Sequence, residues 1–380
     1  MRKKVLVGLS GGVDSAVAAY LLIKQGYDVT GGFMRNWDSL ANGDYLGNPT
    51  INDAQCPQEK DYADAMAVAK KLGIPLLRCD FVKEYWDHVF TYFLDEYKHG
   101  RTPNPDVFCN KYIKFDSFLK FAKEKGFDYI GMGHYVKRVE EGGIAYLYKA
   151  ADKNKDQSYF LSQINEQQIA SCLFPLSDIK KPEVRKIAHE LDLESVMDKK
   201  DSTGVCFIGE RNFREFLKNY FPATKGDIVE GSTGKVVGTH CGVLYYTLGQ
   251  RKGLGIGGIK GEESEGGFFV YKKDVKKNIL YVAHPKDDYL LQSDRCLVSD
   301  INWIGPKPEG KIEVGVKFRY RQPDQPASLH FEGDNVVLEY KDHPVKAVTP
   351  GQIAVFYLGE RMLGGGKIES VYRNGERVDL

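Results

Sequence analysis

The sequence predicts an α/β protein in which a doubly wound parallel sheet is followed by a small connector domain and a C-terminal antiparallel β-barrel. Apolar runs of strand length alternate with helical patterns through the first half of the chain. From about residue 211 glycines become frequent, and apolar residues alternate in short runs. A chain of 380 residues is longer than one ordinary domain, so we expect domains at 1–210, 211–286 and 287–380.

The first half alternates between strands and helices. We expect strands at 5–9, 27–34, 74–81 and 127–132, and helices at 13–25, 82–97 and 112–125. Apolar residues at helical spacing indicate one more helix, and these are Tyr62, Ala65, Met66, Ala69 and Leu72. Strands that alternate with helices form parallel sheets, whose ligands bind at the carboxyl ends of the strands. Residues that directly follow the first strand are therefore the first candidates for a site.

The second half reads as a series of short antiparallel strands. We expect them at 234–238, 242–249, 266–273, 279–284, 296–304, 311–321, 327–333, 335–340 and 353–359. Such a series suggests a connector built from small β units and then a compact barrel from about residue 287.

The first strand ends in "GLSGGVDS", residues 8–15, which we call the phosphate loop. It contains G-x-S-x-G, the pattern that presents a nucleophilic serine in hydrolases, with Ser10 as the candidate. That serine needs an oxyanion hole supplied partly from an earlier strand, and here there is no earlier strand. A phosphate site requires only a strand, a glycine turn and a helix N-terminus. A structural turn that binds nothing is the third reading, since Ser10 could simply cap the helix.

The loop also differs from the common lysine-containing phosphate motif, because no Gly-Lys-Ser/Thr follows its glycines. The hydroxyls of Ser10 and Ser15 and the carboxylate of Asp14 suit pyrophosphate and a Mg²⁺ ion instead.

Composition excludes several other classes of protein. The 53 basic and 52 acidic residues nearly cancel, so any nucleic acid must be bound by local patches. Charges or glycines interrupt every apolar run well before the ~20 residues that span a bilayer, and we expect a cytoplasmic protein. The seven cysteines include no C-x-x-C pair, which argues against a zinc knuckle. We therefore predict no protein ligands for a metal among the site residues.

Two cysteines lie in segments that suit chemistry. "RTPNPDVFCNKYIKF" places Cys109 just before the helix expected at 112–125, close to Lys111 and Lys114. A helix N-terminus and nearby cations lower a thiol pKa, so we expect a thiolate there. Asp106 could act as a general acid or base, or could cap the helix. Cys206, in "DSTGVCFIGERNF", would by itself more often be a buried apolar residue.

The phosphate loop resembles the PP-loop of the N-type ATP pyrophosphatases, a Rossmann-like superfamily that splits ATP between its α and β phosphates and adenylates a substrate. Together, "NPDVFCN" and "GVCFIGERNF" resemble the two cysteine segments of the tRNA-specific 2-thiouridylase family. This resemblance implies ATP-dependent adenylation of the C2 oxygen of the wobble uridine, at tRNA position 34, followed by replacement of that oxygen with sulfur. It also implies that Cys206 carries the sulfur as a persulfide, that Cys109 is the second catalytic thiol, and that a transient disulfide joins them.

Further positions follow from the resemblance one at a time. It implies nucleotide contacts, with Mg²⁺ present, at Gly8, Leu9, Ser10, Gly11, Gly12, Val13, Asp14, Ser15, Met34 and Gly133. It implies tRNA contacts at Asn104, Pro105, Asp106, His134, Lys155, Asp156, Gln157, Arg319, Tyr320 and Gln352, with the target base flipped out of its stack. A hydrogen-bonded loop histidine is an equally good reading of His134, and charges on a strand such as "KFRYRQ" are usually its solvated face.

The implied partners are the tRNAs for Lys, Glu and Gln, and a persulfide donor such as a cysteine desulfurase or a sulfur-relay protein. Two other functions stay open on the residues alone. One is an ATP-dependent amidating ligase of the same pyrophosphatase class, which needs no cysteines. The other is a non-catalytic RNA-binding protein that senses ATP through its phosphate loop.

Overall fold

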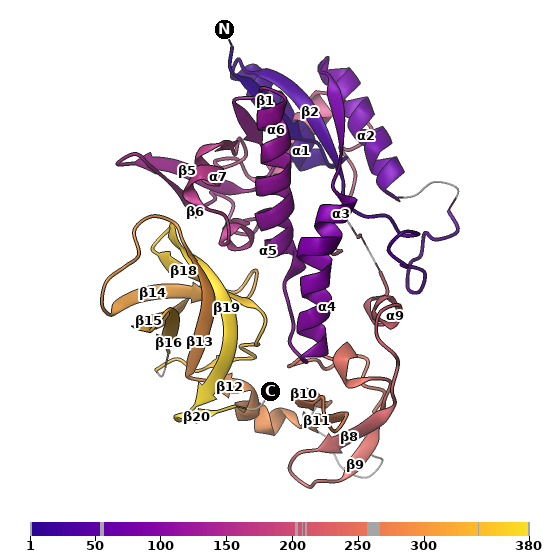
Figure 1. The fold of residues 1–380 in the computed structure, drawn as a ribbon, viewed down its shortest axis with the longest axis vertical. Coiled ribbons are helices and arrows are strands. Elements are labelled where there is room, and N and C mark those ends of the chain that lie inside the picture. Colours follow the sequence, from indigo (N-terminus) through magenta and orange to yellow (C-terminus); the bar gives the residue numbers. More distant parts are fainter. Residues whose placement is uncertain are drawn as a thin grey trace.

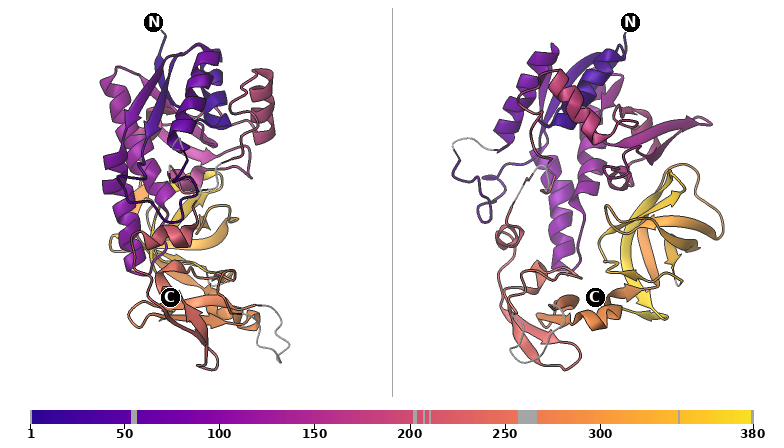
Figure 2. Two further views of the ribbon diagram at one scale, coloured as in Figure 1. Left: turned by 90° about the vertical axis from the view of Figure 1, so that its right-hand side faces the viewer. Right: turned by 180° about the vertical axis from the view of Figure 1, so that it is seen from behind.

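The computed structural model describes residues 2–53, 57–201, 204–206, 208–209, 211–256, 267–340 and 342–378. A parallel sheet with its helices occupies one end of the molecule, and the connector and the barrel occupy the other (Figure 1). The two further views in Figure 2 show the same three parts. The chain therefore forms a parallel sheet with helices, then a connector, then a barrel, which is the order that its sequence pattern predicts.

Five parallel strands form the N-terminal sheet. They are β1 (Lys4–Gly8), β2 (Asp28–Arg35), β3 (Leu76–Asp80), β4 (Tyr129–Gly131) and β7 (Cys172–Leu173), in the order β3-β2-β1-β4-β7. β1 is the central strand and is buried from its second residue onward, as expected for a strand covered on both faces. The predicted doubly wound sheet is confirmed, and β7 is a strand that the sequence pattern did not indicate.

Helices cover both faces of this sheet. Successive residues of β1 point to opposite sides, so each face of the strand packs against a different set of helices. Val5 and Val7 pack with α1 (Val13–Lys24), α2 (Pro57–Leu72) and α8 (Lys181–Glu190). Leu6 packs with two long helices on the other face. The first of these consists of α3 (Val82–Tyr85), η1 (Trp86–Phe90) and α4 (Thr91–Lys98), and the second of α5 (Pro105–Cys109), η2 (Asn110–Ser117) and α6 (Phe118–Glu124).

The second long helix begins earlier than its sequence predicts. We expected a loop through Cys109 and a helix from Tyr112, but the helix starts at Pro105, which occupies the first helical turn. Proline is well placed there, because its fixed φ suits a helix start and its missing N–H would have no partner in the helix. Cys109 therefore lies one turn inside a helix.

A hairpin and three short helical segments follow β4 and connect it to the rest of the chain. The hairpin consists of β5 (Val136–Glu141) and β6 (Ile144–Lys149), and the segments are η3 (Ser158–Leu161), α7 (Glu166–Ala170) and α8. β6 pairs with the barrel strand β19 at Tyr148 and Arg361. The N-terminal part thus contributes a hairpin to the edge of the barrel sheet.

The connector begins with α9 (Phe213–Lys218) and contains a sheet in the order β10-β11-β8-β9. Its strands are β8 (Gly226–Glu230), β9 (Val236–His240), β10 (Phe269–Asp274) and β11 (Ile279–Ala283). The strand expected at 242–249 is wrong, because Val243–Tyr245 forms the 3-10 turn η4. Gly242 turns the chain with φ of 144°, and the buried Tyr245 hydroxyl donates to the Phe221 carbonyl at 2.8 Å.

The C-terminal part is a closed antiparallel barrel, as predicted. Its strands are β13 (Arg295–Trp303), β14 (Ile312–Lys317), β15 (Gln325–Glu332), β16 (Asn335–Glu339), β18 (Ile353–Leu358) and β19 (Arg361–Arg373). Closure follows from the pairing of β13 with both β16 and β19. The short helix η5 (Pro285–Leu291) precedes the barrel, and β12 (Gln292–Ser293), β17 (Val345–Lys346) and β20 (Glu376–Arg377) flank it. Alternate residues such as Val314 and Val316 fill its interior.

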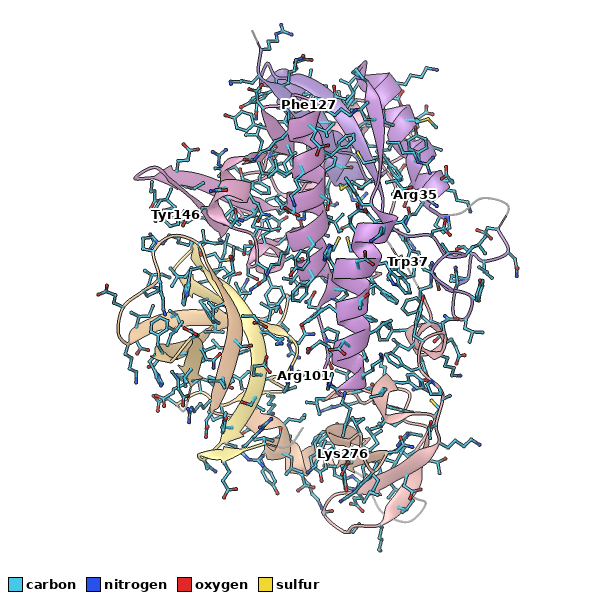
Figure 3. All side chains as sticks on the ribbon, in the orientation of Figure 1. Arg35, Trp37, Arg101, Phe127, Tyr146 and Lys276 are labelled. Carbon is cyan, nitrogen blue, oxygen red and sulfur yellow. The ribbon has the colours of Figure 1, made fainter. Side chains whose placement is uncertain are left out.

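The barrel contacts the N-terminal helices where α4 ends. Arg101, labelled in Figure 3, lies there, and its guanidinium is 2.9 Å from the Glu369 carboxylate on β19. Gln352 donates its side-chain amide to the Thr102 carbonyl at 2.7 Å. These contacts fix the segment that leads into Cys109 against the barrel.

Candidate active site

The phosphate loop joins the end of β1 to the start of α1, at the carboxyl edge of the sheet. Ser10 and Ser15 approach each other with 3.2 Å between their hydroxyl oxygens, and the Ser15 hydroxyl donates to the Gly12 carbonyl at 2.9 Å. Gly11 adopts φ of +70°, and a Cβ there would lie 2.4 Å from the Asp61 carbonyl oxygen. Only glycine fits this close approach. The loop thus presents its backbone and hydroxyls at a helix N-terminus, which is an arrangement suited to an anion.

The other predicted nucleotide contacts lie beside this loop. A Cβ on Gly133 would lie 2.9 Å from the Ser15 nitrogen, so the chain after β4 touches the first turn of α1. A Cβ on Gly8 would lie 3.1 Å from the Met34 side chain, at the end of β2. Leu9 and Val13 have buried side chains and offer only their backbone to a ligand. The structure therefore brings all ten positions to one edge of the sheet.

Asp14 is held by two groups that the sequence did not single out. Lys181 donates from Nζ to both carboxylate oxygens of Asp14, at 2.7 and 2.8 Å. The Tyr135 hydroxyl donates to the same carboxylate at 2.7 Å. No local pattern marks Lys181, because it lies 167 positions from Asp14 and only the packing of α8 on α1 brings it there.

The two cysteines predicted to act together do lie together. Their sulfur atoms are 3.7 Å apart, with Cys109 fully buried and Cys206 partly exposed. The backbone of Cys206 is held on both sides, because its N–H donates to Asp106 at 3.0 Å and its carbonyl accepts from the Tyr85 hydroxyl at 2.9 Å. Asp106 therefore holds the backbone at Cys206. The alternative role, a cap for its own helix, is not seen, because the N-terminus of α5 has no side-chain cap hydrogen bond.

The two thiols have opposite electrostatic environments. Burial raises the pKa of Cys109 well above its usual value, so the expected thiolate at Cys109 is wrong. The hydrogen bond donated by Cys109, together with Lys114, lowers the pKa of Cys206 despite its burial. Of the two thiols, Cys206 is therefore the one that loses its proton more readily. Burial also raises the pKa of the Asp106 carboxyl.

Lys114 reaches the thiols because the helix is π-helical at this point. In the π-helix η2 the backbone hydrogen bonds join residues five positions apart, so Lys114 lies one turn after Cys109 along the helix. Cys206, Cys109 and Asp106 hold the pKa of Lys114 above its usual value, although burial opposes this. Lys111, the other cation expected there, instead donates to Gln163 at 3.1 Å.

His134 links the thiol pair to the phosphate loop. It follows Gly133, which touches α1, and its ring lies 5.7 Å from the ring of Phe115 on η2. Burial and the nearby Lys114 hold the pKa of His134 well below its usual value, so the ring is neutral. Its buried Nδ1 has no hydrogen-bond partner within the described part of the chain. Asn104 and Pro105 lie at the start of α5, four or five residues before Cys109.

The remaining tRNA positions divide into exposed and buried groups. Arg319 is exposed, and Tyr320 packs its ring 4.4 Å from that of Phe160. Gln157 accepts from the Tyr135 N–H at 3.0 Å, and Gln352 donates to the Thr102 carbonyl, so each amide holds a neighbouring segment.

Asp156 is the one fully buried side chain among the expected contacts at 155–157. Its carboxylate is buried and accepts from Ala150, Ser158 and Lys317, which means that it fastens the segment to the barrel. Lys155 forms an ion pair with Asp201.

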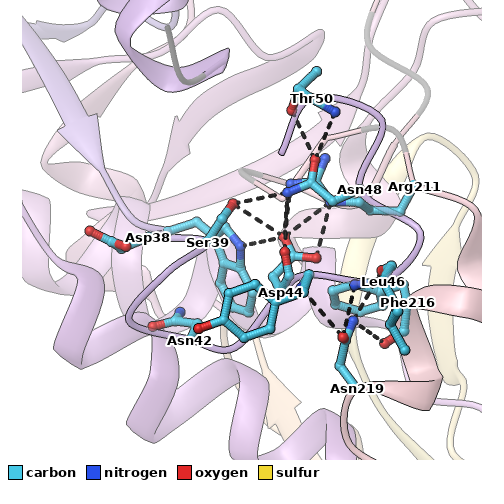
Figure 4. A network of polar contacts seen from close by, with 12 residues as sticks. Asp38, Ser39, Asn42, Asp44, Leu46, Asn48, Thr50, Arg211, Phe216 and Asn219 are labelled. Atoms are coloured by element: carbon cyan, nitrogen blue, oxygen red, sulfur yellow. Dashed lines mark hydrogen bonds and ion pairs between the residues drawn. The ribbon is translucent and has the colours of Figure 1, made fainter. Parts of the chain in front are cut away.

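The segment after Cys206 is anchored by a buried ion pair. Arg211 donates to Asp44 at 2.8 Å, and both side chains are almost fully buried (Figure 4). Trp37 donates to the same carboxylate at 3.0 Å, and Asn48 contacts it at 3.5 Å. The loop between β2 and α2 is thereby fixed to the chain that leads from Cys206 into α9. Ser202, Thr203, Phe207 and Glu210 of the expected segment lie outside the described residues.

Two classes of site are not found in the described ranges. No cluster of three His, Cys, Asp or Glu side chains there could hold a metal ion. No helix of that part of the chain is long and apolar enough to cross a membrane.

Three family models match the chain in succession. They are described as a tRNA methyl transferase HUP domain at residues 3–210, a tRNA methyl transferase PRC-barrel domain at 214–284 and an aminomethyltransferase beta-barrel domain at 293–368. The tRNA-specific 2-thiouridylase MnmA of Mesoplasma florum is 55% identical and aligns over 98% of this chain and 100% of its own length. The proteins of that name from Mycoplasma capricolum subsp. capricolum and Klebsiella pneumoniae subsp. pneumoniae are 54% and 52% identical, over 98% and 97% of this chain and 100% and 97% of their own lengths. With matches of this extent, the chain belongs to the family of tRNA-specific 2-thiouridylases.

Proposed function

We propose that this protein thiolates tRNA, replacing the C2 oxygen of the wobble uridine with sulfur at the expense of ATP. The observation that carries the proposal is the pair of thiols, 3.7 Å apart, of which Cys109 is fully buried with a raised pKa and Cys206 has a lowered pKa. Such a pair can receive, transfer and release sulfur by thiol exchange without a metal. Methyl transfer, the reaction in two of the family descriptions, would leave this pair without a role.

The first step in this proposal activates the base. The C2 oxygen attacks the α phosphate of ATP, pyrophosphate leaves, and the oxygen becomes part of an adenylate. The phosphate loop would hold the pyrophosphate through backbone N–H groups at the start of α1 and the hydroxyls of Ser10 and Ser15. Asp14, now held by Lys181 and Tyr135, would supply a carboxylate ligand to Mg²⁺. Met34 and Gly133 border the place proposed for the nucleoside.

The second step transfers sulfur. The terminal sulfur of a Cys206 persulfide attacks C2, the C–O bond breaks, and AMP leaves with the original oxygen. Cys109, once deprotonated, attacks the Cys206 sulfur, which breaks the S–S bond, leaves the new sulfur on the base and forms a disulfide. The two sulfurs must approach by about 1.7 Å to reach the bonded distance. A dithiol reductant then supplies two electrons to restore both thiols.

The polar groups around the thiols suit the target base. We propose the buried Nδ1 of His134 and the second carboxyl oxygen of Asp106, whose Oδ1 accepts from Cys206, as contacts to an extruded uracil, together with Asn104 and Pro105. We propose Lys155, Arg319 and Tyr320 as contacts to the rest of the tRNA. The tRNAs for Lys, Glu and Gln and a persulfide-carrying donor protein complete the proposed partners. The amidating ligase and the ATP-sensing module need no thiol pair, so the pair's geometry favours neither.

Mass spectrometry of nucleosides tests the proposal. Purified protein, unmodified tRNA, ATP, Mg²⁺ and a persulfide donor should yield 2-thiouridine together with AMP and pyrophosphate. Cys206→Ser and Cys109→Ser should each abolish turnover, whereas Cys241→Ser, in the connector, should retain it. Thiolation that persists in both site variants would refute the proposal, and pyrophosphate release that does not require tRNA would argue against adenylation of the base.

A further inference from the structure

Lys181 connects the phosphate loop to the segment that carries Cys206. It is the first residue of α8, which packs on α1 and lies in front of the sheet in the right-hand view of Figure 2. Besides the two contacts to Asp14, its Nζ lies 2.7 Å from an Asp201 carboxylate oxygen, and its side chain is only 9% exposed. An ammonium has three donors, so two carboxylates engage the whole of its capacity.

Asp201 lies five positions before Cys206 and is tied down by cations. Lys155, Lys181 and Arg185 contact its carboxylate. Hydrogen bonds from Lys155 and Lys181 overcome the effect of burial and hold the pKa of Asp201 at about 2. Asp201 is therefore ionised at neutral pH, and its position depends on these cations.

A second contact joins the same two regions independently. Lys199 donates to the Gly11 carbonyl of the phosphate loop at 2.9 Å, and also to Asp61 and Asp64 at 2.7 Å each. Residues 199–201 therefore touch the phosphate loop at its backbone and, through Lys181, at its carboxylate. A change in the charge of the loop acts directly on the chain that leads to Cys206.

We propose that Lys181 is a positioning residue that couples occupation of the phosphate loop to the freedom of the Cys206 segment, an inference that rests on the proposed use of ATP. A bound pyrophosphate competes with Asp201 for the Lys181 ammonium, and Mg²⁺ competes with Lys181 for Asp14. Both effects withdraw Lys181 from its present contacts. Without nucleotide, Lys181 holds Asp201 beside the phosphate loop, five positions before Cys206, and adds to the contacts that Asp106 and Tyr85 make with the Cys206 backbone. With nucleotide, Asp201 loses one cation, and Cys206 gains freedom to carry sulfur to the adenylated base.

The test measures how fast iodoacetamide alkylates Cys206, followed on the peptide that contains it, with and without Mg²⁺ and α,β-methylene ATP. The wild-type protein should react at least about tenfold faster with nucleotide, the factor for one lost hydrogen bond to a charged group. Lys181→Met should react at the faster rate in both conditions. A wild-type rate that nucleotide does not change, or a Lys181→Met protein with the wild-type response, would overturn the coupling.

Matched variants separate coupling from simple loss of charge. Lys155→Met removes a cation from Asp201 without touching Asp14, so its response to nucleotide should persist. Lys181→Arg keeps the charge and should restore part of the response. Should Lys181→Met fail to fold, Asp201→Asn breaks the same connection, and it too should respond no further to nucleotide. A wild-type response in Asp201→Asn would also overturn the proposal.

This assay contains neither tRNA nor a sulfur donor, so it is independent of thiolation. Calorimetric titration of the nucleotide analogue accompanies it. Binding without a change in Cys206 reactivity overturns the coupling and leaves the proposed function standing. Normal coupling in a protein that makes no 2-thiouridine contradicts the proposed reaction and supports the coupling. Absence of nucleotide binding overturns both.

Discussion

Replacing Cys109 with alanine should make Cys206 less reactive, although the two residues belong to different segments. Cys109 is fully buried, and its Sγ lies 3.7 Å from that of Cys206. Its hydrogen bond is the largest influence that lowers the pKa of Cys206, followed by Lys114. Cys109→Ala removes this donor, so the thiolate on Cys206 loses stabilisation and a larger fraction of Cys206 is protonated at neutral pH.

The magnitude follows from the strength of a hydrogen bond to a charged acceptor. Such bonds contribute about 1.5–3 kcal/mol, and a long contact from a weak S–H donor falls at or below the lower limit, near 1–1.4 kcal/mol. At a pH below the pKa of Cys206, this loss corresponds to a decrease of about five- to tenfold in the fraction of Cys206 that is a thiolate. The rate of alkylation of Cys206 by iodoacetamide at pH 7 should fall by the same factor, and the midpoint of its pH profile should rise.

Cys109→Ser is the matched control, because its hydroxyl keeps a donor at the same place. It should retain most of the wild-type rate at pH 7. An alanine variant that reacts as fast as the wild-type protein over the whole pH range would refute the shared-proton account. A serine variant as slow as the alanine variant would show that the loss has another cause.

Four further predictions concern other parts of the site. Lys114→Met should slow alkylation of Cys206 at pH 7 more than Lys114→Arg does, because only the arginine keeps a cation beside the thiolate, and equal rates in the two variants would contradict the role of charge. Gly11→Ala should abolish binding of the ATP analogue in calorimetry, since its Cβ would lie 2.4 Å from the Asp61 carbonyl, whereas Gly142→Ala, at φ of +58° in open space, should bind normally. Arg211→Met should lower the free energy of unfolding by about 3–5 kcal/mol in urea titrations, because it leaves Asp44 buried without its cation. The matched Lys218→Met, which breaks the partly exposed pair with Glu215, should cost no more than about 1 kcal/mol, and similar losses in both would argue against a special role for the buried pair. A fluorophosphonate should leave Ser10 unlabelled, and labelling there would restore the hydrolase reading.

The sequence predicted the sheet, the phosphate loop and the barrel because each depends on local patterns. Apolar runs between helical segments are enough to indicate β1 and α1, and the glycines of the loop mark the turn between them. Short strands such as β7, and the turn η4, lie below what such patterns resolve. Gly242 is a turn signal for η4, but the apolar residues that follow it favoured a strand in our interpretation.

The electrostatics of the site could not be predicted in the same way. Cys109 has cations within a few residues, yet burial decides its protonation state, and burial is a property of the packed helices. From the sequence, Lys111 and Lys114 are equally good candidates for the cation near Cys109. The π-helical turn η2 brings Lys114 to the thiols, whereas Lys111 donates to Gln163. Lys181 reaches Asp14 only through the packing of α8 on α1. Asp156 resembles a surface residue in its sequence context but is buried and accepts a hydrogen bond from Lys317 of the barrel.

The central claim is that Cys206 carries the transferable sulfur and Cys109 releases it. The most direct measurement is peptide mass spectrometry after the protein has reacted with a persulfide donor in the absence of tRNA. The account predicts the added mass of one sulfur atom on the peptide that contains Cys206, retained in Cys109→Ser and absent in Cys206→Ser. Sulfur found on Cys109 while Cys206 remains unmodified would contradict it.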